Sequence, residues 1–118
     1  MMNLSIEDTE GIRLVTVPGE TLDASNAKDF KAALMPSLVT GGKVILDLSK
    51  LKFVDSSGLG AMLSALRQLN GVSGDLKLCG MNKPIRALFE LVRMHRVFEI
   101  YNTREEAVRS FRNEGPAA

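Results

Sequence analysis

A carboxylate, two hydroxyls and two glycines follow one another closely in the segment Asp55-Ser56-Ser57-Gly58-Leu59-Gly60. Apolar residues recur behind this segment at helical spacing, which predicts an amphipathic helix that reaches about Asn70. A phosphate on Ser57 would add about −1.5 to −2 charges at neutral pH. The free N–H groups and the dipole of a helix N-terminus favour an anion, so we expect the fold to tolerate it. These residue types therefore suit a serine that another enzyme phosphorylates.

Two carboxylates determine how a partner protein would meet such a phosphate. Asp55 directly precedes the hydroxyls, and Asp23 lies in an earlier polar connection. A phosphate beside carboxylates is repelled, and burying it in an interface without a cation costs several kcal/mol. Since about 1.4 kcal/mol is a tenfold change in affinity, the phosphate would turn a tight complex into a weak one. We predict Ser57 as the phosphorylated residue, with Ser56 as the second candidate.

The two glycines bear on whether this helix start is only structural. Asp55 or Ser56 could simply cap the helix, a contribution of about 1 kcal/mol, while Gly58 and Gly60 pack against the sheet. However, each glycine costs up to about 1 kcal/mol relative to alanine in a helix. We therefore expect the small residues to open the surface, so that the backbone of a partner can approach the hydroxyl.

Catalysis by this chain is not predicted. The only histidine, His95, stands between arginines, and no pattern directs it at Ser57 as a general base. The sequence contains neither the Gly-x-Ser-x-Gly turn of esterases nor a phosphate-binding Gly-Lys-Ser/Thr loop. Nucleotide binding at this segment is therefore a weaker third hypothesis. The lone Cys79 has no partners for a metal site and is interpreted as a buried strand thiol, so we expect neither a metal nor a cofactor.

The composition is that of an ordinary globular domain. The chain has 118 residues, of which 45% are hydrophobic and 25% charged, and its net charge is +1. The mixed charges do not form a nucleic-acid-binding surface, and no apolar run is long enough to span a membrane. The N-terminus lacks the pattern of a secretory signal, so a cytoplasmic location is expected.

Strands and helices alternate along the chain after an opening hairpin. Strands are predicted at residues 4–6, 12–17, 43–48, 76–79 and 97–101. Helices are predicted to begin near Ser25, Asp55, Asn82 and Thr103, and Pro36 should end or kink the first of them near Met35. The third helix should bury Ile85, Leu88, Phe89 and Val92.

This order predicts an α/β domain with a mixed, largely parallel β-sheet of four or five strands and four helices. Residues 1–112 should form the domain and 113–118 a flexible C-terminal tail, with fraying from Arg112 onward. In such a sheet, the connections after Leu22, Val54 and Gly80 gather at the carboxyl ends of the strands. Asp23, Asp55 to Gly58, and Met81-Asn82 should therefore lie at one end of the molecule.

Four segments of the chain together form a recognisable pattern: Gly19-Glu20-x-Leu22-Asp23, Val44-Ile45-Leu46-Asp47-Leu48, Phe53-Val54-Asp55-Ser56-Ser57-Gly58-Leu59-Gly60 and Val97-Phe98-Glu99-Ile100. In these segments the chain resembles a known family, the bacterial anti-sigma factor antagonists with their STAS domain. The resemblance runs from about Leu4 to Phe111. This chain differs from the family in having Met94-His95-Arg96 where a glycine or small residue often precedes Asp-Arg-Val-Phe.

The resemblance implies a partner switch. In the family, a serine kinase of the histidine-kinase-like ATPase fold, which is also the anti-sigma factor, phosphorylates the position matched by Ser57. A metal-dependent serine phosphatase removes the phosphate, and the unphosphorylated antagonist binds the kinase and releases its target. For this chain the resemblance implies Asp55 and Asp23 in partner contact. Together with the positions expected at the same end of the sheet, the residues predicted to bind a partner are Asp23, Asp55, Ser56, Gly58, Leu59, Met81 and Asn82. Asp47 is expected to be structural. The alternative is a STAS-type binding subunit of a transport or signalling complex in which Ser57 is only a cap.

Overall fold

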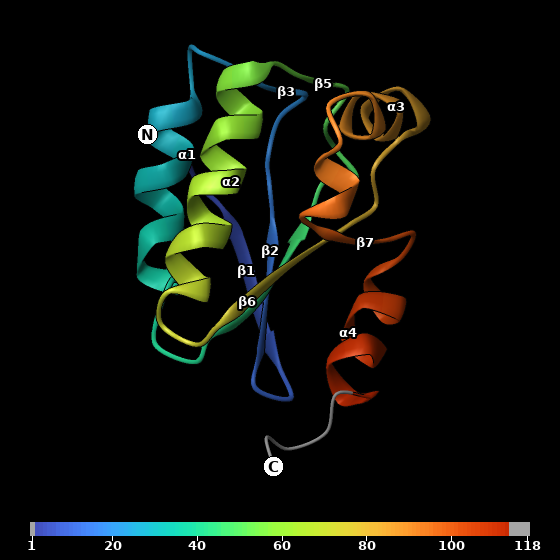
Figure 1. The fold of residues 1–118 in the computed structure, drawn as a ribbon. Coiled ribbons are helices and arrows are strands. Elements are labelled where there is room, and N and C mark those ends of the chain that lie inside the picture. The colour runs from blue at the N-terminus through green and yellow to red at the C-terminus, as the bar shows by residue number, and fades with distance from the viewer. Residues whose placement is uncertain (1, 114–118) are drawn as a thin grey trace.

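A five-stranded mixed sheet lies between helices on its two faces in the computed structural model, which describes residues 2–113 (Figure 1). The strand order is β1-β2-β4-β6-β7, with β1 antiparallel to β2 and all other neighbours parallel. The strands are β1 (Ser5–Thr9), β2 (Ile12–Thr16), β4 (Lys43–Asp47), β6 (Asp75–Cys79) and β7 (Glu99–Tyr101). The predicted fold class is confirmed.

The part of the chain that the structure describes also contains four α-helices: α1 (Ala27–Leu34), α2 (Ser56–Asn70), α3 (Lys83–Leu91) and α4 (Arg104–Asn113). Helices α1 and α2 lie side by side on one face of the sheet, and α4 covers the other face (Figure 1). Pro36 ends α1 as predicted, because the chain tightens there into the 3-10 helix Met35–Ser37. The first turn of α2 lies at the upper end of the view, and the last turn of α4 lies at the opposite end (Figure 1).

Strand β4 shows why the sequence of the central sheet is almost continuously apolar. Val44 and Leu46 pack into the core beneath α1 and α2, whereas Ile45 packs on the other side with Cys79 and Phe111. Both faces of this strand are covered, so neither face can be polar at low cost. Cys79 is fully buried, which confirms its interpretation as a buried strand thiol. Burial and the nearby charge of Asp47 raise the pKa of this thiol to about 12.

Two short strands outside the main sheet correct the sequence prediction. The segment after Gly19 was predicted as a polar connection, but Thr21–Leu22 forms strand β3, which pairs in parallel with β5 (Phe53–Val54). Leu22 and Val54 are both buried, so this ribbon is held by core packing as well as by its hydrogen bonds. The ribbon leads directly into the start of α2.

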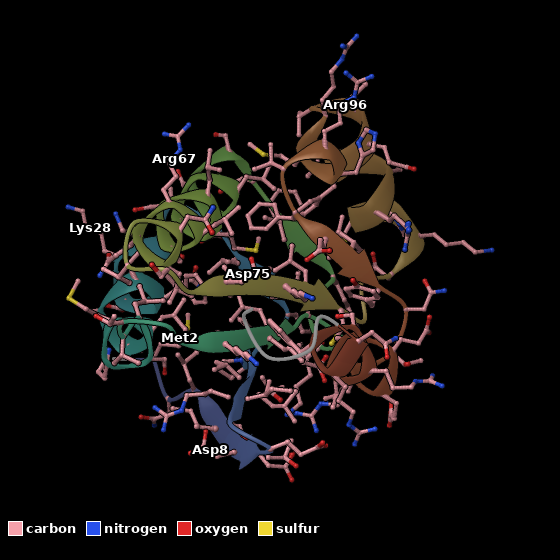
Figure 2. All side chains as sticks on the ribbon, turned by 60° about the horizontal axis from the view of Figure 1, so that its bottom comes forward. Met2, Asp8, Lys28, Arg67, Asp75 and Arg96 are labelled. Atoms are coloured by element: carbon pink, nitrogen blue, oxygen red, sulfur yellow. The ribbon has the colours of Figure 1, made fainter. Side chains whose placement is uncertain are left out.

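The segment after α3 also differs from the prediction. Val92 and Val97 are exposed, although Val92 was expected on the buried face and Val97 in the last strand. The reason is the backbone of Arg93, whose φ of +62° is left-handed and turns the chain into the 3-10 helix Met94–Arg96. His95 is exposed, and Arg96 projects from this corner of the molecule (Figure 2).

Buried charges hold α4 against the sheet. Lys77 is fully buried, and its Nζ donates to Ser110 Oγ at 2.9 Å and lies 4.0 Å from the ring centroid of Phe111. Asp47 is buried on the same face, and its Oδ2 lies 2.8 Å from Arg104 Nε. The structural role expected for Asp47 therefore agrees with its position.

The C-terminal helix extends further than predicted. Fraying was expected from Arg112, but α4 continues to Asn113. Arg112 donates two hydrogen bonds to the carboxylate of Glu10 in the β1–β2 turn, one of them at 2.7 Å, and so fixes the last turn. Residues 114–118 of the predicted tail lie outside the described residues.

Candidate partner-binding site at the start of helix α2

Ser56 and Ser57 occupy the first turn of α2, and both are exposed. Within residues 2–113, neither hydroxyl takes part in a hydrogen bond. Free N–H groups of the helix start lie nearby, and the helix dipole favours a negative charge at this position. Both hydroxyls are therefore accessible to another enzyme, and the helix start suits the anion that phosphorylation would create.

The carboxylate of Asp55 links the helix start to a second loop. Its Oδ1 accepts the N–H of Gly58 at 2.9 Å, which makes Asp55 the N-cap of α2. Its Oδ2 accepts the N–H of Ala24 at 3.1 Å, although the two residues are 31 positions apart in the sequence. The backbone continues the link, because the N–H of Asp55 donates to Leu22 O at 3.2 Å.

Asp23 organises the loop that Asp55 contacts. Its Oδ1 accepts the N–H of Ser25 at 2.9 Å and also accepts the Ser25 hydroxyl. These hydrogen bonds from Ser25 hold the pKa of the Asp23 carboxyl below its usual value. In return, the N–H of Asp23 donates to Asn26 Oδ1 at 2.9 Å. The loop therefore holds a half-exposed carboxylate beside the start of α2.

A third connection meets the same end of the sheet at Met81 and Asn82. Asn82 caps α3 by accepting the N–H of Ile85 at 2.9 Å, as its sequence position predicts. Its Nδ2 also donates to Leu51 O at 3.1 Å, which ties this connection to the segment before β5. Met81 is half-buried and packs against the core. Together, these contacts bring Asp23, Asp55, Ser57 and Asn82 to one end of the molecule, which we call the switch face.

Gly58 and Leu59 are buried and do not lie on the switch face, although both were predicted to bind a partner. A Cβ atom at Gly58 would lie 2.4 Å from Leu22 O and 2.9 Å from Val54 Cγ1. Gly58 is therefore needed for the close approach of α2 to the β3–β5 ribbon, and it does not open the surface. Leu59 is only 7% exposed and belongs to the core. Gly60, in contrast, is exposed, and a Cβ atom there would meet nothing within 4 Å.

Two features of the site were not predicted from the sequence. The backbone N–H of Ala24 contacts Asp55, and no side-chain pattern could have indicated this contact. Phe53 is 54% exposed on β5, immediately before Val54 and the cap. A strand prediction for this segment would have placed Phe53 outward, because neighbouring side chains in a strand alternate and Val54 points inward.

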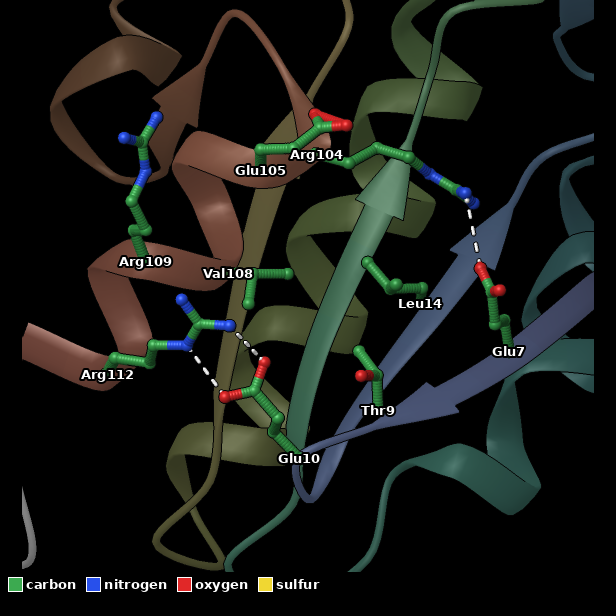
Figure 3. A pocket seen from close by; sticks show the side chains of 9 residues that line it. All are labelled: Glu7, Thr9, Glu10, Leu14, Arg104, Glu105, Val108, Arg109 and Arg112. Carbon is green, nitrogen blue, oxygen red and sulfur yellow. Dashed lines mark hydrogen bonds and ion pairs between the residues drawn. The ribbon is translucent and has the colours of Figure 1, made fainter.

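A groove of about 380 Å³ lies elsewhere, between the β1–β2 hairpin and α4 (Figure 3). Its walls are joined by the ion pairs of Arg104 with Glu7 and of Arg112 with Glu10, and its floor includes Leu14 and Val108. None of the predicted site residues lines it. Within residues 2–113, no three His, Cys, Asp or Glu side chains cluster as metal ligands. None of the helices there has the length and apolar character needed to cross a membrane.

Relatives match this chain over nearly its whole length. The model of the STAS domain family matches residues 3–107. BtrV of Bordetella bronchiseptica is 30% identical over 116 residues, which cover 98% of this chain and 99% of that protein. The anti-sigma-B factor antagonist of Listeria monocytogenes is 36% identical over 110 residues, which cover 89% of this chain and 95% of that protein.

Solved structures share the fold. An anti-sigma factor antagonist from Thermotoga maritima superposes with a TM-score of 0.84 at 24% identity, covering 92% of this chain and 94% of that chain. SpoIIAA from Bacillus has been solved unphosphorylated and phosphorylated. The unphosphorylated form gives a TM-score of 0.68 at 23% identity and covers 97% of this chain and 100% of that chain. The family match and the two relatives identify the chain more closely than the fold alone: it belongs to the STAS domain family, among the anti-sigma factor antagonists.

Proposed function

We propose that this protein is a phosphorylatable anti-sigma factor antagonist whose unphosphorylated form binds a serine kinase that is also an anti-sigma factor. Binding releases the target that the kinase holds, and phosphorylation of Ser57 ends the binding. The chain acts in this scheme as a binding regulator and as the substrate of other enzymes. A kinase of the histidine-kinase-like ATPase fold adds the phosphate, and a metal-dependent serine phosphatase removes it.

The observation that carries this proposal is the exposed hydroxyl of Ser57 in the first turn of α2, beside the capping carboxylate of Asp55. A phosphate at this position meets free helix N–H groups, so the fold can tolerate it. The carboxylates of Asp55 and Asp23 are also negative, so they would repel the phosphate and would not neutralise its charge. A partner that covers the switch face would have to bury this charge, at a cost of several kcal/mol.

The relatives reported above support the same reading. The Listeria protein is named an anti-sigma-B factor antagonist, and SpoIIAA, which shares the fold, has been solved in a phosphorylated form. These names favour an antagonist over a binding subunit of a transport or signalling complex. The target released by the kinase is a sigma factor in this proposal.

The test is intact-mass analysis of the chain after incubation with ATP and purified candidate kinases of this fold from the source organism. Wild type and Ser56→Ala should each gain one phosphate, and Ser57→Ala should gain none. A phosphate on Ser57→Ala equal to that on wild type would refute the site. In a binding titration without ATP, Ser57→Asp should keep the fold and bind the kinase at least about tenfold more weakly than wild type, a difference of about 1.4 kcal/mol. Equal affinities of Ser57→Asp and wild type would refute the idea that negative charge at position 57 prevents binding.

A further inference from the structure

Phe53 is the one phenylalanine of this chain that the core does not use. The other four phenylalanines, Phe30, Phe89, Phe98 and Phe111, are at most 3% exposed, whereas Phe53 is 54% exposed. Aromatic side chains contribute much of the energy of both cores and interfaces, so an exposed one stands out in a small domain. More than half of Phe53 is therefore left outside the core.

The backbone around Phe53 is fixed. Its N–H donates to Glu20 O at 3.1 Å, and the residue pairs with Thr21 in the β3–β5 ribbon. Val54, the next residue, points into the core, so the strand presents Phe53 outward. An aromatic ring on such a strand has only two rotatable side-chain bonds, so little entropy is lost when a partner covers it.

The position of Phe53 relates it to the switch face. Only Val54 separates it from the cap, Asp55, and the same ribbon supplies Leu22 O, which accepts the N–H of Asp55. Lys52 Nζ and Glu20 Oε1 form an exposed ion pair at 3.2 Å beside it. An apolar centre with a polar, charge-balanced border is the usual anatomy of a protein interface, and its aromatic residues carry much of the binding energy.

We propose that Phe53 is an apolar anchor of the interface with the kinase, and that the kinase offers it a pocket lined by apolar side chains. This inference rests on the proposed function. It adds to that function an attractive contact that does not depend on phosphate. In this scheme a phosphate on Ser57 prevents binding, and Phe53 contributes affinity when Ser57 is unphosphorylated.

The test uses the kinase that phosphorylates wild type in the experiment above, titrated against variants without ATP. Phe53→Ser should bind at least about tenfold more weakly than wild type, which corresponds to about 1.4 kcal/mol. Leu91→Ser is the matched control, because Leu91 is 80% exposed but lies at the end of α3, and it should bind within about twofold of wild type. Phe53→Leu keeps an apolar side chain and should retain more affinity than Phe53→Ser. Thermal melts of each variant check folding.

Wild-type affinity for both Phe53→Ser and Phe53→Leu would overturn the inference, as would an equal loss in Leu91→Ser. If Phe53→Ser does not fold, Phe53→Thr takes its place, because threonine is polar but suits a strand, and an affinity within about twofold of wild type overturns the inference. Ser57→Asp in the same titration separates the two proposals. If Ser57→Asp loses binding while Phe53→Ser does not, only the anchor is wrong. If no kinase phosphorylates wild type, or if Ser57→Asp binds as wild type does, the proposed function is wrong as well.

Discussion

The carboxylate of Asp55 accepts the backbone N–H of Ala24 at 3.1 Å and thereby joins the start of α2 to the loop that holds Asp23. The other oxygen of the same carboxylate caps the helix through Gly58. One side chain therefore fixes both the orientation of the Ser57 turn and the position of the neighbouring loop. The geometry of the switch face depends on it more than on either serine.

Replacing Asp55 should separate the cap from the charge. Asp55→Ala should lower stability by about 1 kcal/mol, since the cap is lost, and lower the melting temperature by about 4 °C. Asp55→Asn should melt between Asp55→Ala and wild type, because asparagine still caps the helix but its Nδ2 cannot accept the N–H of Ala24. Calorimetric melts check both. An Asp55→Ala protein that melts with wild type would show that the cap contributes nothing.

The two glycines of the first helical turn should respond oppositely to alanine. Gly58→Ala should destabilise the protein by at least about 1–3 kcal/mol, because the new methyl group would meet Leu22 O and Val54. Gly60→Ala enters open space and should stabilise the helix by about 0.5–1 kcal/mol. Urea denaturation of the pair measures both free energies of unfolding. Equal changes in the two variants would contradict the assigned packing.

The ion pair of Asp47 with Arg104 should contribute more to stability than the ion pair of Glu10 with Arg112, which lies in the last turn of the same helix. Arg104→Ala would leave the buried Asp47 carboxylate without its guanidinium, and a loss of about 3 kcal/mol is expected. Arg112→Ala should have a much smaller effect, since Arg112 and Glu10 are both about half exposed and water screens them. Denaturation curves compare the two. A larger loss for Arg112→Ala would refute this ranking.

Cys79 should react slowly in the native protein. Its pKa of about 12 lies well above the usual value of about 8.5, so roughly 10³-fold less thiolate is present at pH 8 than in the unfolded chain. Labelling by a thiol-reactive disulfide reagent, with and without denaturant, measures this difference. Because the pKa is raised on folding, this group stabilises the fold below about pH 8.5, and the contribution is lost as the pH rises toward 12. Equal rates of labelling would show that the thiol is accessible.

Asp23 should titrate below the usual range of an aspartate. The hydrogen bonds from Ser25 favour the charged carboxylate, so the NMR titration midpoint should lie under 3.8 and should rise in Ser25→Ala. Since folding lowers this pKa, the stabilisation is present above pH 3.8 and is lost as the pH falls through the folded value. A midpoint that does not move in Ser25→Ala would place the cause elsewhere.

Local patterns were sufficient to predict most of the fold and the position of Ser57 in the first turn of α2. The helical spacing from Leu59 to Leu69 and the continuous apolar run of β4 each reflect how an element meets the core, and both survive in the structure. The caps at Asp55 and Asn82 depend on residues only three positions away. Interactions of this short range can be predicted from the sequence.

Contacts between distant segments could not be predicted in the same way. The β3–β5 ribbon pairs Thr21 with Phe53, and neither two-residue strand has enough length to show a period. The role of Gly58 depends on Leu22 O, a backbone atom that no residue type reports. Lys77 occupies a core position only because Ser110 and Phe111 from α4 receive its side chain. These features arise from tertiary packing.

The course of α4 has a practical consequence for experiments on this protein. The helix ends at Asn113, at the end of the molecule opposite the first turn of α2 (Figure 1). A fluorophore or a sensor-chip linker attached at Asn113 would therefore be anchored away from Ser57. Protein immobilised in that orientation should leave the first turn of α2 facing the solution, and a bulky fusion partner attached at Asn113 would not cover Ser57.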